Sequence, residues 1–318
     1  MSTFGGIDLG GTKIQAAILD AKNKVLGSAR RPTPTEGGPA DVAKEMEGAL
    51  RDAAKDAKVD PTKLTGLGVG SPGTIEDGSV TSARNLPGWE GSFPLAQTLE
   101  DSLGCKVRVG NDVRVATNAE FKLGAGRDSE SLLGVFWGTG VGGGVILNGE
   151  PWLGRGAAGE IGHVVVEIGG ARCTCGRLGC MEAYAGRAAM EAHVGDLIEK
   201  GHKTDLFKLM KERDRTRLTS GIWARALHHE DKLAGQVLDR AVRALGAGVA
   251  SIVNVLDVES VVIGGGLGVR LGEPYAKRIE EAMLPHLFVD SRPPKVQVAE
   301  LGDLGGAIGA VLLVQDEG

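Results

Sequence analysis

The sequence predicts an α/β fold of two lobes. The chain has 318 residues, which is long for one hydrophobic core and suits two. Apolar strand-like runs alternate with amphipathic helical patterns along its length. A glycine-rich turn between two strand-like runs occurs at 6–13 and again, roughly 130 residues later, at 137–144, which indicates an internal duplication. We expect a small ligand to bind in a cleft between the lobes.

The first lobe is expected to begin with a hairpin, after which helices and strands alternate. Apolar runs predict its strands, and apolar residues at helical spacing predict its helices. The expected elements are strands at 4–8, 15–19, 64–69 and 107–109 and helices at 41–58, 95–103 and 113–122. We place this lobe at 1–117, with the C-terminal helix at 303–318 as a candidate to return to it.

The second lobe, at 118–302, repeats the opening pattern and then becomes mainly helical. Asn148-Gly149 predicts a tight hairpin turn, and the many charges of 196–217 indicate a solvated helical face. The expected elements are strands at 132–137, 143–147, 260–263 and 295–298, helices at 181–194, 233–256, 273–287 and 304–313, and a glycine-rich loop at 154–180.

Composition excludes several classes of function. The chain has 36 Lys and Arg against 41 Asp and Glu, a formal charge of −5, and so lacks the basic surface that nucleic-acid binding needs. It has no run of about 18 apolar residues for a membrane span, and its first 20 residues do not resemble a signal peptide. We therefore expect a cytoplasmic protein whose partners are small molecules, not nucleic acid or membrane.

Two glycine-rich turns suit phosphate binding. The first, Asp8-Leu-Gly-Gly-Thr-Lys13, lacks the Walker A spacing. Its backbone N–H groups could hold phosphate oxygens and Asp8 could hold Mg²⁺, although a plain hairpin turn is the alternative. The second, Gly138-Thr-Gly-Val-Gly-Gly143, matches a dinucleotide fingerprint, but that fingerprint requires a helix next. A strand-like run follows instead, so we interpret this turn as a second phosphate cradle.

Two strand ends carry further candidates. Asp112 follows Asn111 at the end of a short strand, where its carboxylate could accept a proton from an attacking hydroxyl. The alternative is a helix N-cap, for which both residue types are favoured. In Val261-Val-Ile-Gly-Gly-Gly266, an apolar strand runs into three glycines. This suits close contact with a nucleoside, and a tight strand-to-helix turn explains it equally well.

A cluster of cysteines predicts a metal site. Cys105 stands alone among the four cysteines, and the other three lie within eight residues of one another. The predicted ligands are His163, Cys173, Cys175 and Cys180. Such a set is typical of structural zinc, and the metal would order a loop with little apolar content. A redox pair or unrelated thiols are the alternatives. Glu160 and Glu182 flank the cluster, and paired acceptors of this kind suit sugar hydroxyls.

Together these motifs resemble the ROK family of sugar kinases and sugar-responsive repressors. The resemblance runs from about residue 4 to 314 with the motifs in the family's order. It rests on Asp8-Leu-Gly-Gly-Thr-Lys13, Asn111-Asp112, Glu160-x-x-His163 and Cys173-x-Cys-Gly-x-x-Gly-Cys-x-Glu182. Asn85-Leu-Pro-Gly-Trp89, which follows Gly70-Ser-Pro-Gly73, is most similar to the bacterial glucokinase branch.

The resemblance implies an actin-like, ribonuclease H-like ATPase fold and phosphoryl transfer from ATP, with Mg²⁺, to the 6-hydroxyl of a hexose, here glucose. Asp112 is implied as the catalytic base. The implied sugar contacts are Asn85, Asn111, Asp112, Glu160, His163 and Glu182. The implied contacts to ATP and Mg²⁺ are Asp8, Gly10, Gly11, Thr12, Lys13, Gly138, Thr139 and Gly140, with Gly265 and Gly266 near the nucleoside. Homodimers or homotetramers are implied as well.

Alternatives remain within and outside the kinase class. Fructose, N-acetylglucosamine, N-acetylmannosamine and allose are alternative acceptors, and polyphosphate or ADP are alternative donors. A rival of another class is a non-catalytic, sugar-sensing regulator of the same family. Those relatives carry a DNA-binding helix-turn-helix ahead of the kinase-like part, whereas here the first strand is expected at about residue 4.

Overall fold

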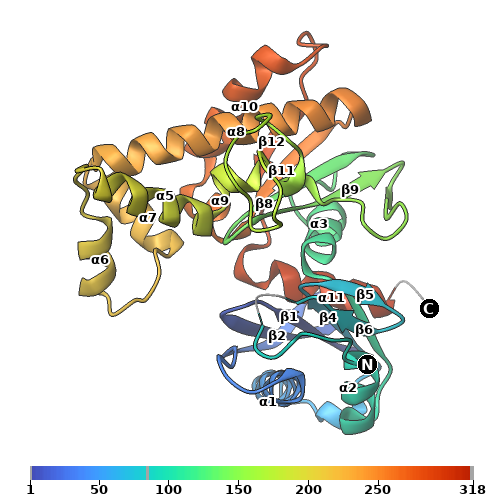
Figure 1. Cartoon of the computed structure of the whole chain (residues 1–318). Coiled ribbons are helices and arrows are strands. Elements are labelled where there is room, and N and C mark those ends of the chain that lie inside the picture. The colour runs from blue at the N-terminus through green and yellow to red at the C-terminus, as the bar shows by residue number, and fades with distance from the viewer. Residues whose placement is uncertain (1, 84–85, 316–318) are drawn as a thin grey trace. The chain divides into compact units, whose positions relative to one another are not determined.

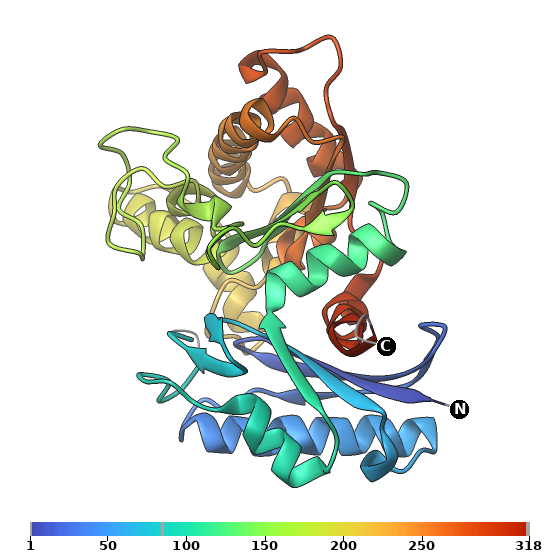
Figure 2. The ribbon, with the colours of Figure 1, turned by 90° about the vertical axis from the view of Figure 1, so that its right-hand side faces the viewer.

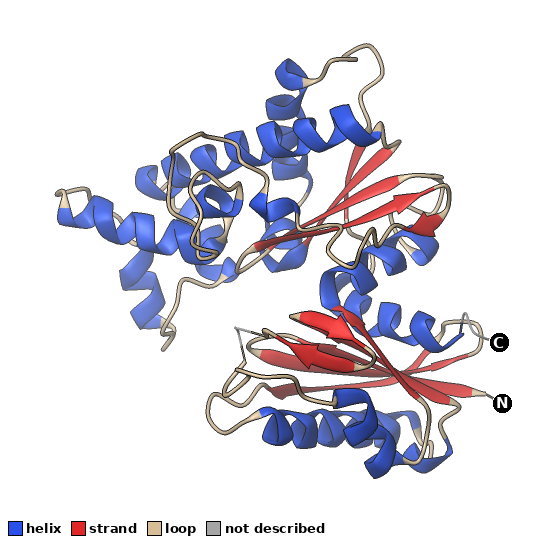
Figure 3. Cartoon of the chain, turned by 45° about the vertical axis from the view of Figure 1, so that its right-hand side comes forward, coloured by secondary structure: helices blue, strands red, loops and turns tan. Residues whose placement is uncertain are grey.

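The computed structural model describes residues 2–83 and 86–315, and the chain forms two compact units. Unit 1 comprises Met1–Gly124 with Glu300–Gly318, and unit 2 comprises Ala125–Ala299. Each unit is built on its own five-stranded sheet, with helices packed against it (Figures 1 and 3).

The sheet of unit 1 has the strand order β3-β2-β1-β4-β7. The first three strands form an antiparallel meander, and β4 and β7 extend the sheet in parallel with β1. Its strands are β1 (Thr3–Leu9), β2 (Lys13–Asp20), β3 (Val25–Pro32), β4 (Gly66–Ser71) and β7 (Val107–Asn111). In β2, Ala16 and Ile18 belong to one buried cluster and Ala17 and Leu19 to another. Burial on both faces explains the unbroken apolar run of this strand.

Helices cover both faces of this sheet (Figure 2). Helices α1 (Pro39–Ala57) and α2 (Leu95–Leu103) lie on one face. On the other, α11 (Gly305–Gln315) lies against the sheet and α3 (Asp112–Leu123) lies against α11. A small separate hairpin, β5 (Thr74–Glu76) and β6 (Ser79–Thr81), follows β4.

Glycines allow α11 to lie directly on the strands. At Gly6 of β1 and Gly68 of β4, an added Cβ would overlap the backbone carbonyls of Ala307 and Ala310. At Gly309, within α11 itself, it would overlap the carbonyl of Val115 in α3. Such close packing joins the C-terminal helix to the N-terminal sheet.

The boundary between the units lies between residues 124 and 125, rather than at the 117/118 expected from the sequence. The expected position falls inside α3, which continues to Leu123. The chain returns to unit 1 at residue 300, where the buried carboxylate of Glu120 accepts the N–H groups of Glu300 and Leu301 at 3.0 and 2.9 Å. The chain therefore re-enters unit 1 a few residues before α11 begins.

Unit 2 repeats the strand pattern of unit 1. Its order is β10-β9-β8-β11-β12, with an antiparallel meander of β8, β9 and β10 and parallel pairing from β8 through β11 to β12. Its strands are β8 (Leu132–Trp137), β9 (Val141–Leu147), β10 (Glu150–Pro151), β11 (Ser260–Gly264) and β12 (Lys295–Val298). The matching topology is what an internal duplication predicts. Asn148 and Gly149 have φ values of 53° and 80°, as the predicted hairpin turn requires.

The long helix α8 (Lys232–Leu256) runs through the core of unit 2. The other helices of this unit are α4 (Glu182–Ala185), α5 (Arg187–Glu199), α6 (Leu206–Glu212), α7 (Ser220–His228), α9 (Gly265–Leu271) and α10 (Glu273–Met283). Trp137 and Trp223 are fully buried in the same core.

The single helix expected at 181–194 is two helices, α4 and α5. They are separated by Gly186, whose ψ of 132° is not helical. The break lets the first N–H groups of α5, from Arg187 and Ala188, donate to the carbonyls of Gly138 and Thr139 at 3.1 Å each. These long-range hydrogen bonds override the local helical pattern.

Other expected elements differ in extent. The segment 196–217 is not one solvated face, because α6 within it buries Leu206 and Leu209. The helix expected at 273–287 ends at Met283, and a 3₁₀ turn, Leu284–His286, follows. Pro285 in that turn lacks the N–H that an α-helix would need. Among the described residues, no helix is long and apolar enough to cross a membrane.

Candidate active site and metal centre

The first glycine turn follows β1. The N–H of Gly10 donates to the carbonyl of Lys13 at 2.9 Å, which closes the turn into β2. Thr33 holds it from the side, because its Oγ1 donates to the carbonyl of Gly10 at 2.6 Å and its N–H donates to the carbonyl of Thr12 at 3.3 Å. Gly11 and Thr12 are exposed. The tip of the turn is therefore fixed by the protein and open to a ligand.

Asp8 precedes this turn and carries a perturbed carboxyl group. Its pKa is raised to about 6, chiefly by burial; the charge of Lys13 opposes this rise and that of Asp303 adds to it. Lys13 forms an ion pair with Asp303, with its Nζ 3.1 Å from Asp303 Oδ1. The first residues of α11 crowd the same carboxyl group, and an added Cβ on Gly306 would lie 2.6 Å from Asp8 Cγ. A half-buried carboxylate at an open turn fits Mg²⁺, which prefers oxygen ligands.

Asn111 and Asp112 stand at the same edge of the sheet as Asp8. Strands β1, β4 and β7 are parallel, and their register places Asp8 opposite Gly70 and Gly70 opposite Gly110. With adjacent strands about 4.8 Å apart, the backbones of Asp8 and Gly110 are about 10 Å apart. The carboxyl edge of parallel strands is the usual ligand-binding edge of α/β sheets. Unit 1 thus gathers three predicted residues at one edge.

The N-cap of α3 is Asn111, not Asp112. The Oδ1 atom of Asn111 accepts the N–H of Arg114 at 3.2 Å, and its Nδ2 donates to the carbonyl of Gly73 at 3.4 Å. Asp112 is the first helical residue, half-buried, and its Oδ1 accepts the N–H of Val113 at 3.0 Å. N-capping therefore explains the presence of Asn111, but it does not explain the carboxylate of Asp112.

Asn85, a predicted sugar contact, lies outside the described residues. The end of its motif has a structural role. Trp89 is buried, donates its Nε1–H to the carbonyl of Val80 at 3.0 Å and meets the ring of Phe93 edge-on at 5.7 Å. This anchors the described part of the loop on β6.

The second glycine turn joins β8 to β9. A strand follows it, as the sequence predicted, and not the helix of a dinucleotide fold. The turn at Gly265 and Gly266 lies beside it, because β8 and β11 are parallel neighbours. An added Cβ on Gly138 would be 4.0 Å from the nitrogen of Gly266. Gly265 has a φ of 78° and no room for a Cβ against Trp137, so the tight strand-to-helix turn is present.

The second turn offers unpaired backbone donors. The carbonyls of Gly138 and Thr139 are turned toward the start of α5. The N–H of Val141 donates to Glu182 Oε2 at 2.9 Å. In the described part of the chain, the N–H groups of Thr139 and Gly140 have no acceptor. Adjacent N–H groups of this kind suit an anionic oxygen.

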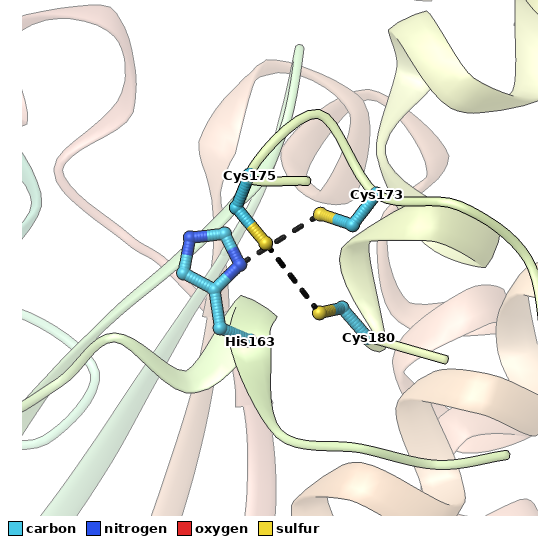
Figure 4. Close-up of side chains that lie close together, drawn as sticks. All are labelled: His163, Cys173, Cys175 and Cys180. Carbon is cyan, nitrogen blue, oxygen red and sulfur yellow. Dashed lines mark hydrogen bonds between the residues drawn. The ribbon is translucent and has the colours of Figure 1, made fainter. Parts of the chain in front are cut away.

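The four predicted zinc ligands converge on one point (Figure 4). They are His163, Cys173, Cys175 and Cys180, and their ligand atoms all lie within 4.8 Å of one another. The distance from Cys173 Sγ to His163 Nδ1 is 3.8 Å, and that between Cys175 Sγ and Cys180 Sγ is 3.7 Å. Four ligands at about 2.3 Å from a tetrahedral zinc have sulfur–sulfur edges of about 3.8 Å. The donor set and its spacing therefore fit zinc.

The thiols of this cluster differ in acidity. The backbone N–H of Arg177 lowers the pKa of Cys175 to about 7. Burial, in contrast, raises the pKa of Cys180 to about 12. Cys175 is thus the readiest thiolate near neutral pH, and a bound divalent cation favours the thiolate form of the others.

The two predicted acidic residues beside the cluster differ in their surroundings. Glu160 is exposed next to the 3₁₀ turn Ile161–His163. Glu182 begins α4, and its Oε1 accepts the hydroxyl of Thr174 at 3.2 Å and lies 3.7 Å from Cys173 Sγ. Since its Oε2 binds the N–H of Val141, Glu182 joins the cysteine loop to the second glycine turn.

Tyr184 has a structural role in this region that the sequence alone did not indicate. Its hydroxyl donates to Glu167 Oε2 at 2.6 Å and accepts the N–H of Ala171 at 2.7 Å. Arg240 lies over its ring at 4.5 Å. Tyr184 therefore helps to order the loop that carries the cysteines, through partners that no local motif reveals.

Comparison with known proteins agrees with the motifs. The ROK family description matches residues 4–317. A glucokinase of Thermotoga maritima is 32% identical over 321 residues, which cover 98% of this chain and 96% of that protein. An N-acetylmannosamine kinase of Escherichia coli is 34% identical over 320 residues, 98% of each chain. The crystal structure of a ROK family glucokinase from Streptomyces griseus in complex with glucose and AMPPNP has a TM-score of 0.83 at 28% identity, over 99% of this chain and 100% of that one.

These similarities extend over nearly the whole length of the chain. They confirm the predicted α/β fold of two actin-like lobes. Because the family match spans both units and every motif that carried the resemblance, the chain belongs to the ROK family.

Proposed function

We propose that this chain is an ATP-dependent hexokinase that phosphorylates the 6-hydroxyl of glucose. The observation that carries the proposal is the position of Asp112. It lies at the carboxyl edge of the parallel strands, the same edge at which the strand register places Asp8. Relatives named glucokinase, 32% identical over almost the whole chain, support both the reaction and the sugar.

Asp112 is proposed as the general base. Its carboxylate would accept the proton of the 6-hydroxyl as the sugar oxygen bonds to the γ-phosphorus and the bond to ADP breaks. A positioned base contributes about 10²- to 10⁴-fold to rate. Most of the remaining acceleration in phosphoryl transfer comes from positioning and charge stabilisation.

The glycine turns are proposed to hold the phosphates. In unit 2, the N–H groups of Thr139 and Gly140, which have no acceptor among the described residues, would bind phosphate oxygens. In unit 1, the exposed tip of the first turn and Lys13 would serve the same purpose. Mg²⁺ bound at Asp8, directly or through water, would neutralise charge on the phosphates.

Zinc at the cysteine cluster is proposed as structural. It would order the loop that holds Glu160 and Glu182, which we assign, with His163, Asn111 and Asn85, to the sugar. An ionised carboxylate has about four acceptor positions. Glu182 therefore retains capacity for a sugar hydroxyl beside its bonds to Val141 and Thr174.

N-acetylmannosamine is the second candidate substrate. Relatives named N-acetylmannosamine kinase are 34% identical over 98% of the chain, which is as high as the identity to the glucokinases. The two sugars would use the same base and the same donor site. They differ at the 2-position, where the site must accommodate either a hydroxyl or an acetamido group.

The proposal is tested by ADP release from zinc-loaded protein with ATP and Mg²⁺. The acceptors are glucose, fructose, mannose, N-acetylglucosamine and N-acetylmannosamine, with tripolyphosphate replacing ATP in a parallel assay of sugar phosphate. We expect the highest kcat/KM for glucose with ATP. Preference for N-acetylmannosamine would change the substrate and keep the mechanism. Absence of turnover with every acceptor and both donors would refute the kinase.

A further inference from the structure

A cavity of about 310 Å³ lies beside the second glycine turn, entirely within unit 2. Its lining residues are Thr139, Arg187, Ala188, Glu191, Ala192 and Arg217. Thr139 is the middle residue of the turn. The first turns of α5 contribute Arg187, Ala188, Glu191 and Ala192. The cavity therefore adjoins the N–H groups of Thr139 and Gly140 that have no acceptor within the described chain.

The guanidinium of Arg187 is held in a fixed orientation at this cavity. Its Nη2 donates to Thr139 Oγ1 at 2.9 Å, and its Nη1 donates to Ser220 Oγ at 3.1 Å. A guanidinium has five N–H donors in a planar fork, so three remain after these two bonds. The two hydroxyls orient the group and, being neutral, do not form an ion pair with it.

The charges around the cavity favour an anion. Among the described residues, neither Arg187 nor Arg217 forms an ion pair. The lining carboxylate, Glu191, accepts the backbone N–H of Leu218 at 3.0 Å. Burial lowers the pKa of Arg187, and the nearby charge of Arg217 lowers it further, although Glu191 opposes both. Two arginines face one carboxylate at this cavity, and a partly buried cation that has no ion-pair partner among the described residues is stabilised when an anion enters.

We propose that this cavity binds a phosphate group of the phosphoanhydride donor, with Arg187 as its direct ligand and Arg217 as a weaker, more exposed contact. The proposal rests on the proposed kinase function and names the donor side of its site. Thr139 connects the two parts, since its N–H lies in the glycine turn and its hydroxyl binds Arg187. An arginine fork matches a phosphate better than the ammonium group of a lysine does.

The test is calorimetric titration of the zinc-loaded, 318-residue chain with Mg-ADP and, separately, with tripolyphosphate, without sugar. We expect Arg187→Gln to weaken both ligands by roughly ten- to a hundredfold, as the loss of a charge-assisted hydrogen bond predicts. Arg187→Lys should recover only part of this loss. Arg217→Gln, at an exposed position, should weaken both ligands severalfold, and it serves as the test if the Arg187 variants do not fold.

The matched control is Arg243→Gln, which removes the same charge from an exposed position on α8 and should leave both affinities unchanged. Unaltered affinity in Arg187→Gln, or loss confined to Mg-ADP, would overturn the phosphate assignment. Loss for tripolyphosphate alone would support it and identify an inorganic donor. Because binding is measured without turnover, Arg187-dependent binding by a chain that phosphorylates no sugar would refute the kinase and keep this site.

Discussion

Replacement of Asp8 by asparagine should stabilise the protein at neutral pH. The pKa of this carboxyl is raised from 3.8 to about 6, chiefly by burial. The folded chain therefore holds a proton that the unfolded chain releases between about pH 4 and pH 6. The stability that protonated Asp8 contributes is fully present only below the unfolded pKa of 3.8. It decreases as the pH rises and is lost above the folded pKa of about 6.

The size of the effect follows from the two pKa values. The free energy of unfolding that ionisation of Asp8 removes is about 0.6 kcal/mol at pH 4, about 1.6 at pH 5 and about 3 at pH 7. Asparagine has nearly the same shape and no charge, so Asp8→Asn should gain that amount over the wild-type protein at each pH. Mg²⁺ and nucleotide are omitted, because a bound cation would stabilise the ionised form.

The assay is urea unfolding of both proteins followed by circular dichroism at pH 4, 5, 6 and 7. Effects of pH on the cysteine cluster are common to both proteins and cancel in the difference. The control is Asp20→Asn at the far end of the same hairpin, where backbone N–H groups of Lys24 and Lys22 lower the pKa of the carboxyl. That substitution should destabilise the protein at neutral pH. A gain for Asp8→Asn that is absent at pH 7, or that is larger at pH 4, would refute the reasoning.

Two further substitutions test the metal centre and the packing of unit 1. Cys175→Ala should reduce zinc from about one per chain to near zero and lower the thermal midpoint with it, as read by metal analysis and thermal unfolding. Cys105→Ala should leave the zinc content unchanged, and a fully stable, zinc-free Cys175→Ala protein would contradict a structural metal. Gly68→Ala should destabilise unit 1 by about 1–3 kcal/mol or more, since its Cβ would overlap the backbone of α11, whereas Gly91→Ala has open space. Equal unfolding midpoints in urea for these two glycine variants would contradict the close packing.

The convergence of the four predicted metal ligands could be foreseen from the sequence because they are rare residue types close together. Cys173, Cys175 and Cys180 lie in one short segment, and His163 is only ten residues away from the first of them. The strands at the sheet edges were predicted for a similar local reason, as apolar runs followed by glycine or Asn-Asp. These local signals place Asp8 and Asp112 at strand ends, although only the parallel register brings the two ends to one edge.

Features that depend on distant partners were missed. Strand β3 was not predicted, because it is an edge strand in which Gly27, Arg30 and Arg31 interrupt the apolar pattern. The break at Gly186 arises from hydrogen bonds to a turn more than 40 residues earlier, at Gly138 and Thr139. Arg187 lies in no motif, and its contact with Thr139 spans 48 residues. The expected homodimer or homotetramer stays a prediction.

The central claim, that Asp112 is the base of a sugar kinase, is tested most directly by Asp112→Asn. ADP release with glucose, ATP and Mg²⁺ is measured beside the calorimetric affinity for glucose, and Asp128→Asn, an exposed aspartate of unit 2, is the control. We predict that kcat falls by at least about 100-fold while glucose affinity stays within a few-fold of the wild-type value. Retention of kcat would contradict the assignment of the base, and loss of glucose binding would show that Asp112 serves mainly to hold the sugar.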